Sequence, residues 1–470
     1  MRADARSSAP PAGGETNGAI AALEGLAGRA VARARAAGAD HAEALIESGR
    51  RLTVRVAGGI VESLKHSATR GLGLRVIVGD RVGFVSSNDL GEDALEDLAR
   101  HAVALARRST PDPANGLPTA TDLGDDPAPG ELGLHDPAVA ALDGTRLAAM
   151  AHALERAAIG VDPRVKRVDA ANLSASSGGG ALANSAGLAR TWNGTSVSAS
   201  VQTLAGDRDG RQQSGSYYAA ARRLDRLPEL EAIAREAARR AAERIGARSV
   251  PTARVPVILH PDVAASWLDD LYGACTADAV MMRESWLASL LGEVIASPLV
   301  TIVDDGRLLS GVGTSPWDGE GVPTRRNVLV ERGRLAMFEY DSYWARRGNT
   351  RSTGNASRSY SSTPGIGYHN LMIEAGAESP AAILARVDRG FYMDDQGSYG
   401  YNPVTGDYSF QAQGFWIEKG AKAFPVDGVT VAGRSLDMLR GIVAVGNDLK
   451  LETSVCAPTL LIGEMTVAGA

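Results

Sequence analysis

The chain has 470 residues, which is too long for one ordinary domain and suits two. Its 49 basic and 55 acidic residues give a formal net charge of −6, and 44% of its residues are hydrophobic, as in a soluble globular protein. A mildly acidic chain without a block of lysine or arginine lacks the surface that binds a phosphate backbone. Nucleic acid is therefore excluded as an expected partner.

The two cysteines, Cys275 and Cys456, are far apart, which excludes a disulfide framework and a metal site of the C-x-x-C type. The first residues contain no apolar segment like that of a secretory signal, and we expect residues 1–18 to form a disordered tail. No stretch of eighteen apolar residues occurs, so we expect no contact with a membrane. We therefore expect a cytoplasmic protein.

The first elements are predicted by hydrophobic spacing and by glycine turns. An alanine-rich helix is expected over residues 19–38, followed by two β-hairpins with turns at residues 57–59 and 79–80. A second helix is expected to begin at Asn88 or Asp89, either of which can cap its free N–H groups. One helix, four strands and a second helix predict a compact α+β unit.

A connection rich in proline is expected over about residues 109–137. A helix over residues 144–160 and strand-like segments between residues 165 and 223 follow it. A long amphipathic helix comes next, and most of the tryptophan and tyrosine residues lie after its start. We therefore predict an N-terminal α+β domain over residues 19–225 and a C-terminal domain over residues 226–470.

The C-terminal domain is predicted to be dominated by mostly antiparallel sheet, with hairpin turns at Arg332-Gly333 and Lys419-Gly420. Regular alternation of strands and helices is absent, which argues against a Rossmann sheet or a TIM barrel. The fold class is therefore predicted to be α+β.

The usual catalytic motifs are missing from the sequence. It contains no G-x-S-x-G elbow and no P-loop, and the G-x-G-x-x-A match at residues 178–183 is expected to be a flexible turn. No histidine is followed by glutamate or has a second histidine within helical reach, so no local imidazole pair can hold zinc. A site built from distant residues stays open.

Two places could still carry chemistry. His260 ends an apolar strand and opens a helix with Pro261 at its first position, and we favour the interpretation that His260 and Asp262 only start this helix. Asp318 and Glu320 form a pair of acids that could perform acid/base chemistry or bind a cation. We expect them instead to be solvated residues of a turn.

Several segments in fixed order resemble the TldD/PmbA family, over roughly residues 38–470. The segments are SPWDGEGVPTRR, DSYWARRGNTRSTGNA, YHNLMIEAGAES, VTGDYSFQAQGFWIEKG, VAVGNDL and the closing PTLLIGEMTVAG. The N-terminal GLGLRVIVGDRVGFVSSNDL is also similar to that family.

The resemblance implies a metallopeptidase built from two homologous subunit types. The TldD type carries H-E-x-x-x-H on a helix and a late cysteine that completes a zinc site. The PmbA type, also called TldE, lacks these ligands and pairs with TldD. The assembled chamber admits and cleaves unfolded or extended peptides, and in the family it trims the leader of a modified peptide antibiotic and degrades an antitoxin.

The zinc motif does not carry over to this sequence. The resemblance places His260 at the first histidine, Pro261 at the glutamate and Ala265 at the second histidine, and residues 445–448 hold no thiol where the late cysteine is expected. Cys456 lies further on, in the expected final strand. The resemblance therefore implies a PmbA/TldE-type chain with no catalytic residue, metal ligand or cofactor of its own, and zinc on a TldD-type partner.

The expected role is architectural, in a heteromer with a TldD-type subunit; the sequence leaves a homodimer open. The segment at residues 406–416 is either an exposed sheet edge that binds an extended peptide or a buried strand with a polar back. The candidates for contacting substrate or lining the chamber are His260, Asp318, Glu320, His369, Asn370, Asp407, Tyr408 and Trp416.

Two other functions stay open from the sequence. One is a self-sufficient peptidase that uses His260 or His369 with Asp318 and Glu320. The other is a non-enzymatic binding or regulatory protein, the class to which an older family label, modulator of DNA gyrase, belongs.

Overall fold

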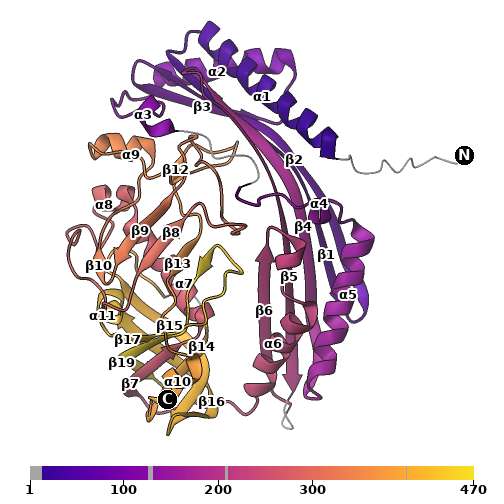
Figure 1. Ribbon diagram of the computed structural model, residues 1–470, viewed down its shortest axis with the longest axis vertical. Helices are drawn as coiled ribbons and strands as arrows, with labels where there is room; N and C mark the ends of the chain where they lie inside the picture. Colours follow the sequence, from indigo (N-terminus) through magenta and orange to yellow (C-terminus); the bar gives the residue numbers. More distant parts are fainter. Residues whose placement is uncertain (1–12, 125–130, 207–209, 398–399, 470) are drawn as a thin grey trace, which may run out of the picture.

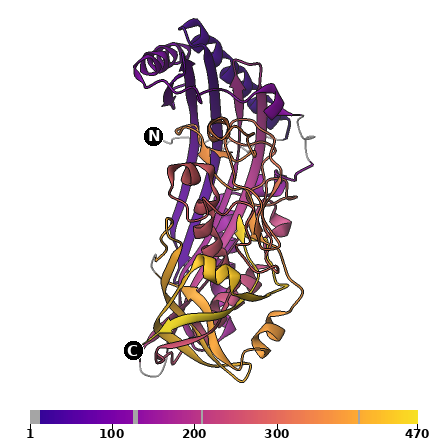
Figure 2. The same ribbon diagram turned by 90° about the vertical axis from the view of Figure 1, so that its left-hand side faces the viewer.

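A computed structural model describes residues 13–124, 131–206, 210–397 and 400–469 of the chain. Within these residues the first half of the chain forms a long curved sheet, and the second half forms a β-rich body along its concave side (Figure 1). Seen from the side, this sheet extends along most of the molecule (Figure 2). Helices and mostly antiparallel sheets are both present, which confirms the predicted α+β class.

The strands of the N-terminal sheet pair antiparallel in the order β3-β2-β1-β4-β5-β6. They are β1 (His41–Ala57), β2 (Ile60–Val78), β3 (Arg81–Ser87), β4 (Val165–Asn184), β5 (Ala189–Gly206) and β6 (Gln212–Ala221). Both predicted hairpins are confirmed, and at the first turn Gly58 and Gly59 have positive φ angles of 60° and 74°, as a tight two-residue turn requires. The prediction of four strands is wrong, because β2 belongs to both hairpins without a break.

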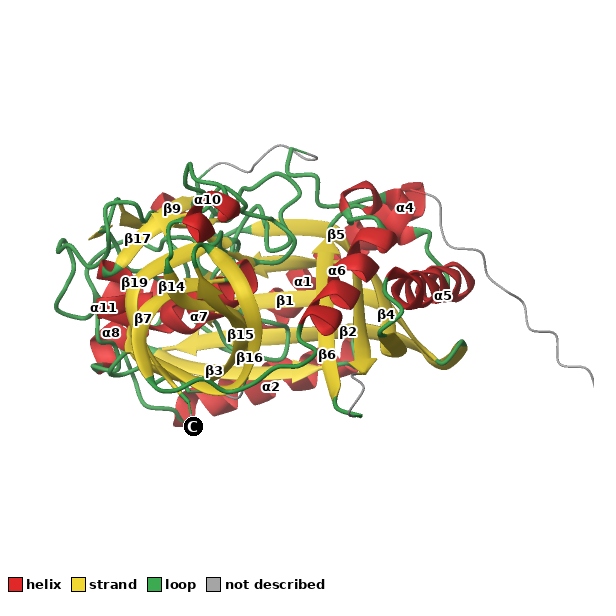
Figure 3. Ribbon diagram, turned by 90° about the horizontal axis from the view of Figure 1, so that it is seen from below, coloured by secondary structure: helices red, strands yellow, loops and turns green. Residues whose placement is uncertain are grey.

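Helices cover one face of this sheet, with the α5–α6 pair beside β4–β6 (Figure 3). The helices on this face are α1 (Gly13–Ala36), α2 (Glu92–Arg108), α4 (Pro137–Ala140), α5 (Gly144–Val161), the 3₁₀ turn η1 (Leu224–Arg226) and α6 (Leu230–Glu243). The short helix α3 (Ala120–Leu123) lies on the other side, where Leu123 packs against Leu45 and Leu182. Residues 1–12 of the predicted tail lie outside the described residues. Residues 13–18 belong to α1, so the tail prediction is wrong for them.

Two local predictions in the N-terminal half are also wrong. The second helix begins at Glu92, and Asp89 does not cap it but accepts a hydrogen bond from the N–H of Gly91 at 3.0 Å. Residues 178–183, predicted as a flexible turn, lie inside β4 and pair with β1 and β5.

The C-terminal body is built around a sheet in the order β16-β15-β14-β7-β19-β17, in which β16 also pairs with β19 and curls the sheet back on itself. Its strands are β7 (Ala253–Leu259), β14 (Arg389–Gln396), β15 (Asp407–Glu418), β16 (Ala421–Arg434), β17 (Ile442–Val445) and β19 (Leu460–Ala468). The β7–β14 pair is parallel and the other pairs are antiparallel.

A second C-terminal sheet has the order β10-β9-β8-β13-β18, and a short pair, β11–β12, lies apart from it. These strands are β8 (Ile302–Asp305), β9 (Arg326–Glu331), β10 (Arg334–Leu335), β11 (Ala356–Ser357), β12 (Gly365–Ile366), β13 (Leu371–Ile373) and β18 (Val455–Cys456). The predicted hairpin at Arg332-Gly333 is present, but β10 is only two residues long. The sequence predicted that Cys456 lies in the final strand. This is wrong, because Cys456 lies in β18 and the final strand is β19.

Short helices connect these strands, and one of them is central to the core. They are α7 (Pro261–Tyr272), the 3₁₀ turn η2 (Gly273–Cys275), α8 (Ala277–Met282), α9 (Ser342–Arg347), α10 (Pro380–Ala385) and α11 (Ser435–Arg440). Trp267 of α7 is fully buried in the largest apolar cluster, where its indole N–H donates to Ser435. Within the described part of the chain, no helix is both long and apolar enough to cross a membrane.

Candidate functional site

His260 stands between β7 and α7, as the sequence predicts, and its ring is used by the fold. Its Nδ1 accepts a hydrogen bond from the backbone N–H of Asp262 at 3.2 Å, which makes His260 the N-cap of α7. Its backbone N–H donates to the carbonyl of Met393 at 2.9 Å. Burial lowers the pKa of the imidazole to about 4, so the ring is neutral at pH 7.

The first turn of α7 lies near two arginines at the end of α6, a helix packed on the N-terminal sheet: Arg240 within α6 and Arg244 directly after it. Arg240 pairs with Asp262 at 2.6 Å. Arg244 pairs with Asp394 at 3.1 Å and with Asp395 at 2.9 Å. A polar cavity of about 250 Å³ lies between these groups, and the ion pairs across it join the two halves of the molecule.

A second set of ion pairs joins the N-terminal sheet to the C-terminal body. Arg75 of β2 lies 3.1 Å from both Glu43 of β1 and Glu320, and Arg358 lies 2.7 Å from Glu43. All four side chains are buried. Burial would raise the pKa of Glu320, but the charges of Arg75 and Arg358 and the N–H of Ser342 lower it below the usual value.

The prediction that Asp318 and Glu320 are solvated is therefore wrong. Asp318 is 4% exposed and Glu320 is 1% exposed. The two oxygens of Asp318 accept hydrogen bonds from the backbone N–H groups of Glu320, Val322 and Ala356. Burial and the charge of Glu320 raise the pKa of Asp318 to about 8. Both acids organise the loop and its contact with the N-terminal sheet.

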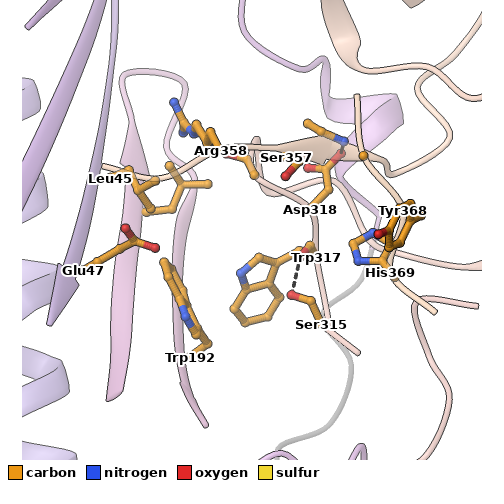
Figure 4. Close-up of a pocket in the computed structure, with 14 residues that line it drawn as sticks. Leu45, Glu47, Trp192, Ser315, Trp317, Asp318, Ser357, Arg358, Tyr368 and His369 are labelled. Carbon is orange, nitrogen blue, oxygen red and sulfur yellow. Dashed lines mark hydrogen bonds between the residues drawn. The ribbon is translucent and has the colours of Figure 1, made fainter. Parts of the chain in front are cut away.

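A cavity of about 200 Å³ lies next to this ionic network, between the inner face of the N-terminal sheet and loops of the C-terminal body (Figure 4). Its lining residues include Leu45, Glu47, Leu182 and Trp192 from the sheet, and Trp317, Asp318, Arg358, Tyr368 and His369 from the loops. Asp318 and His369 are thus brought together, and Glu320 is in the adjacent network.

The remaining predicted residues of this region have structural partners. His369 lies with Nε2 2.9 Å from the carbonyl of Gly354, and its backbone N–H donates to Asp304 at 2.8 Å. The amide of Asn370 donates to Thr314 at 2.9 Å and its oxygen accepts from the N–H of Gly313. His260 is not among the residues that line this cavity.

The segment at residues 406–416 does not form an exposed edge. Its strand, β15, lies between β14 and β16, so the edge hypothesis is wrong and the buried-strand alternative is correct. Tyr408 and Trp416 are buried in the core, while Ser409 on the back of the strand is exposed. Asp407 is exposed at the start of the strand and accepts a hydrogen bond from Thr405.

Sequence reasoning missed the partners that the N-terminal sheet supplies to these loops: Glu43, Glu47, Arg75 and Trp192. A signal was present, because Glu43 and Glu47 lie four positions apart on either side of the apolar residues 44–46. The alternation of side chains along a strand places both acids on the face opposite the helices.

Comparison with known proteins identifies the family. Residues 42–106, 138–245 and 252–469 match domain 1, the central domain and the C-terminal domain of the PmbA/TldA metallopeptidases. The chain belongs to the PmbA/TldD family. It is 31% identical to Metalloprotease PmbA of Escherichia coli O157:H7 over 431 residues, 92% of each chain.

Other members of the PmbA/TldD family are similar to this chain over most of its length. A TldD homologue of Haemophilus influenzae is 27% identical over 442 residues, which cover 87% of this chain and 89% of the relative. The crystal structure of TldE from Thermococcus kodakarensis has the same fold, with a TM-score of 0.83, 23% sequence identity, and coverage of 94% of this chain and 100% of that one.

The side chains at the start of α7 do not fit the zinc site that the family resemblance implies. Pro261 is the first residue of α7 and offers no carboxylate, and Ala265 offers no donor atom. Asp448 accepts hydrogen bonds from the backbone and hydroxyl of Thr459. Cys456 is buried and its thiol donates to the carbonyl of Thr453. Among the residues that the structure describes, no group of three His, Cys, Asp or Glu side chains is placed to hold a metal.

Proposed function

We propose that this chain is a non-catalytic, PmbA/TldE-type subunit, which assembles with a TldD-type subunit into a metalloprotease for unfolded or extended peptides. The start of α7 carries the proposal: His260 is the N-cap, and Pro261 and Ala265 replace the remaining residues of the zinc motif. In this proposal the partner holds the zinc and activates water. Leader-peptide trimming and antitoxin degradation are the family activities to which such a subunit would contribute.

The inner face of the N-terminal sheet supports a role in enclosing peptides. Ser174 and Ser176 of β4 and Ser198 and Ser200 of β5 are half-buried on the face opposite the helices. A hydroxyl-rich wall can exchange hydrogen bonds with a polypeptide backbone and makes few demands on its side chains. Such a wall suits a subunit that guides varied extended substrates.

The proposal is tested by purifying this chain alone, a TldD-type chain from the same genome alone, and the two after co-expression. We expect negligible zinc and no peptide cleavage from this chain, and cleavage of an unfolded polypeptide by the co-expressed pair. A chelator should abolish that cleavage. His260→Asn in this chain should leave the cleavage rate within about twofold, because a single imidazole cannot hold a catalytic zinc, which needs three protein ligands.

The alternatives predict different results. Stoichiometric zinc and cleavage by this chain alone, lost in His260→Ala or Glu320→Ala, would show a self-sufficient peptidase. Isolation of this chain with a protein unrelated to TldD, and never with a TldD-type subunit, would show a binding or regulatory protein.

A further inference from the structure

One row of residues across the inner face of the N-terminal sheet alternates glycine with larger side chains. Gly71 of β2 pairs with Glu47 of β1, Glu47 with Gly180 of β4, and Gly180 with Trp192 of β5. A Cβ at Gly180 would lie 2.4 Å from the indole of Trp192, and a Cβ at Gly71 would lie 2.1 Å from the ring of Tyr360. Aromatic rings therefore cover both glycines, one on either side of the Glu47 carboxylate.

The indole of Trp192 forms one wall of the cavity described above, and Trp317 lies across from it (Figure 4). Leu45 and Leu182 of the sheet add apolar surface. The volume of about 200 Å³ is below the roughly 300–1,000 Å³ of pockets for whole small molecules. The cavity therefore suits one long side chain.

Three polar side chains of the lining are already engaged. The guanidinium of Arg358 pairs with Glu43 at 2.7 Å and donates to the carbonyl of Gly319 at 2.6 Å. Asp318 accepts three backbone hydrogen bonds, and His369 contacts a backbone carbonyl through Nε2. Each of these groups has a partner within the fold, although Nη2 of Arg358 is buried without a hydrogen-bond partner among the described residues.

Glu47 differs from them. One of its oxygens accepts the N–H of Tyr360 at 3.0 Å, and no basic side chain in the described ranges forms an ion pair with it. Arg190 stacks on Trp317 with its guanidinium carbon 5.5 Å from the ring centre, but it is not a lining residue. The cavity thus combines indole walls with a carboxylate that has no basic counter-ion among the residues the structure describes.

We propose that this cavity binds the side chain of a lysine or arginine of an extended peptide, with its cationic group at Glu47 and its aliphatic stem between Trp192 and Trp317. A cation gains from both the carboxylate and the indole faces, and the apolar stem gains from burial. An acidic side chain would be repelled by Glu47. The inference rests on the proposed function, because it assigns a side-chain preference to a peptide-handling subunit.

The test is calorimetric titration of the purified full-length chain with acetylated and amidated pentapeptides of glycine and alanine around one central residue. The central residue is lysine, norleucine or glutamate, so that only the terminal charge separates the first two. We expect the lysine peptide to bind roughly tenfold more tightly than the norleucine peptide. Glu47→Gln, which keeps an acceptor for the N–H of Tyr360, should reduce this preference to about twofold or less.

Glu331→Gln is the matched control, because Glu331 is an exposed glutamate at the end of β9, and it should keep the tenfold preference. Trp317→Phe is a second variant and should weaken binding of the lysine peptide. The melting temperature of this variant shows whether it is folded. Equal affinity for the lysine and norleucine peptides, or a preference that survives in Glu47→Gln, overturns the inference.

The outcomes separate this inference from the proposed function. A co-expressed pair that cleaves peptides, with no lysine preference in this chain, removes the inference and leaves the function. A lysine preference that depends on Glu47, with no peptidase formed by any TldD-type partner, supports the inference and removes the function.

Discussion

The family resemblance places His260 at the first position of a zinc motif, but its ring is used as a helix cap. Nδ1 is occupied by the N–H of Asp262, and Tyr392 packs edge-on against the ring at 6.3 Å between centroids. Burial disfavours the imidazolium and lowers the pKa to about 4. The imidazole of His260 is therefore a neutral structural group in this chain.

The lowered pKa predicts an acid-sensitive contribution to stability. Between about pH 6.5 and pH 4 the unfolded state binds a proton at His260 that the folded state does not, so the free energy of unfolding falls as pH falls through this window. We expect His260 to account for a loss of about 2 kcal/mol between pH 7 and pH 4.5. The His260→Asn variant keeps an acceptor that can cap the helix. Its free energy of unfolding should therefore fall by about 2 kcal/mol less than that of the wild type between pH 7 and pH 4.5, as measured by urea unfolding at each pH.

His101→Asn is the control, because His101 is exposed on α2 and its replacement should leave the pH dependence of the wild-type chain unchanged. Parallel stability curves for the wild type and His260→Asn would contradict the assigned pKa shift.

Strand β4 contains a cluster of glycines that allows neighbouring strands and side chains to pack closely against it. The turn predicted for residues 178–183 is absent, because the glycines allow the adjacent strands and the indole of Trp192 to approach closely. Intrinsic propensity, which disfavours glycine in strands, was outweighed by pairing on both sides.

Gly180→Ala tests this role. The added Cβ would lie 2.4 Å from both the carbonyl oxygen of Ile46 and the ring of Trp192, and we expect the free energy of unfolding to fall by about 2 kcal/mol. Gly160→Ala is the matched control, because a Cβ there meets nothing within 4 Å, and it should be neutral or stabilise α5 by up to about 1 kcal/mol. Chemical denaturation measures both, and equal effects of the two substitutions would contradict the close approach.

At the scale of the whole molecule, arginines join the two halves of the chain. Arg75 and Arg358 share the buried carboxylates of Glu43 and Glu320 at one contact. Arg240 of α6 and Arg244, directly after it, form another. Further arginines donate to backbone carbonyls across the same boundary, as Arg222 does to Thr314 at 3.0 Å and Arg346 does to Gly116 at 3.1 Å. These contacts fix how the C-terminal body lies against the N-terminal sheet.

Arg75→Met should weaken this contact severely. It leaves Glu43 and Glu320 buried with one cation fewer between them, and breaking a buried ion pair on one side typically costs about 3–5 kcal/mol. We expect a loss of at least about 3 kcal/mol in the free energy of unfolding. Arg29→Met removes an exposed ion pair with Glu92 and should change the free energy of unfolding by less than about 1 kcal/mol. Comparable losses in the two variants would show that the buried network contributes no more than a surface pair.

The sequence determined most elements, because they depend on local spacing. The hairpins, the helix at residues 144–160 and the strand–His260–Pro261–helix transition follow from alternation, glycine turns and proline at a helix start. It also determined that Pro261 and Ala265, where the resemblance implies zinc-site residues, have no side-chain donor atom in any fold.

The contacts between side chains of the two halves follow from packing and could not be read from local patterns. Asp318 and Glu320 have the sequence of a solvated turn, yet both are buried. Glu320 pairs with Arg75 of a distant strand, and Asp318 accepts backbone hydrogen bonds, one of them from Ala356. The order of strands placed β15 inside its sheet, and the pairing of β1 with β4 set Glu47 beside Trp192. Contacts of this kind depend on packing between segments hundreds of residues apart, which local patterns do not encode.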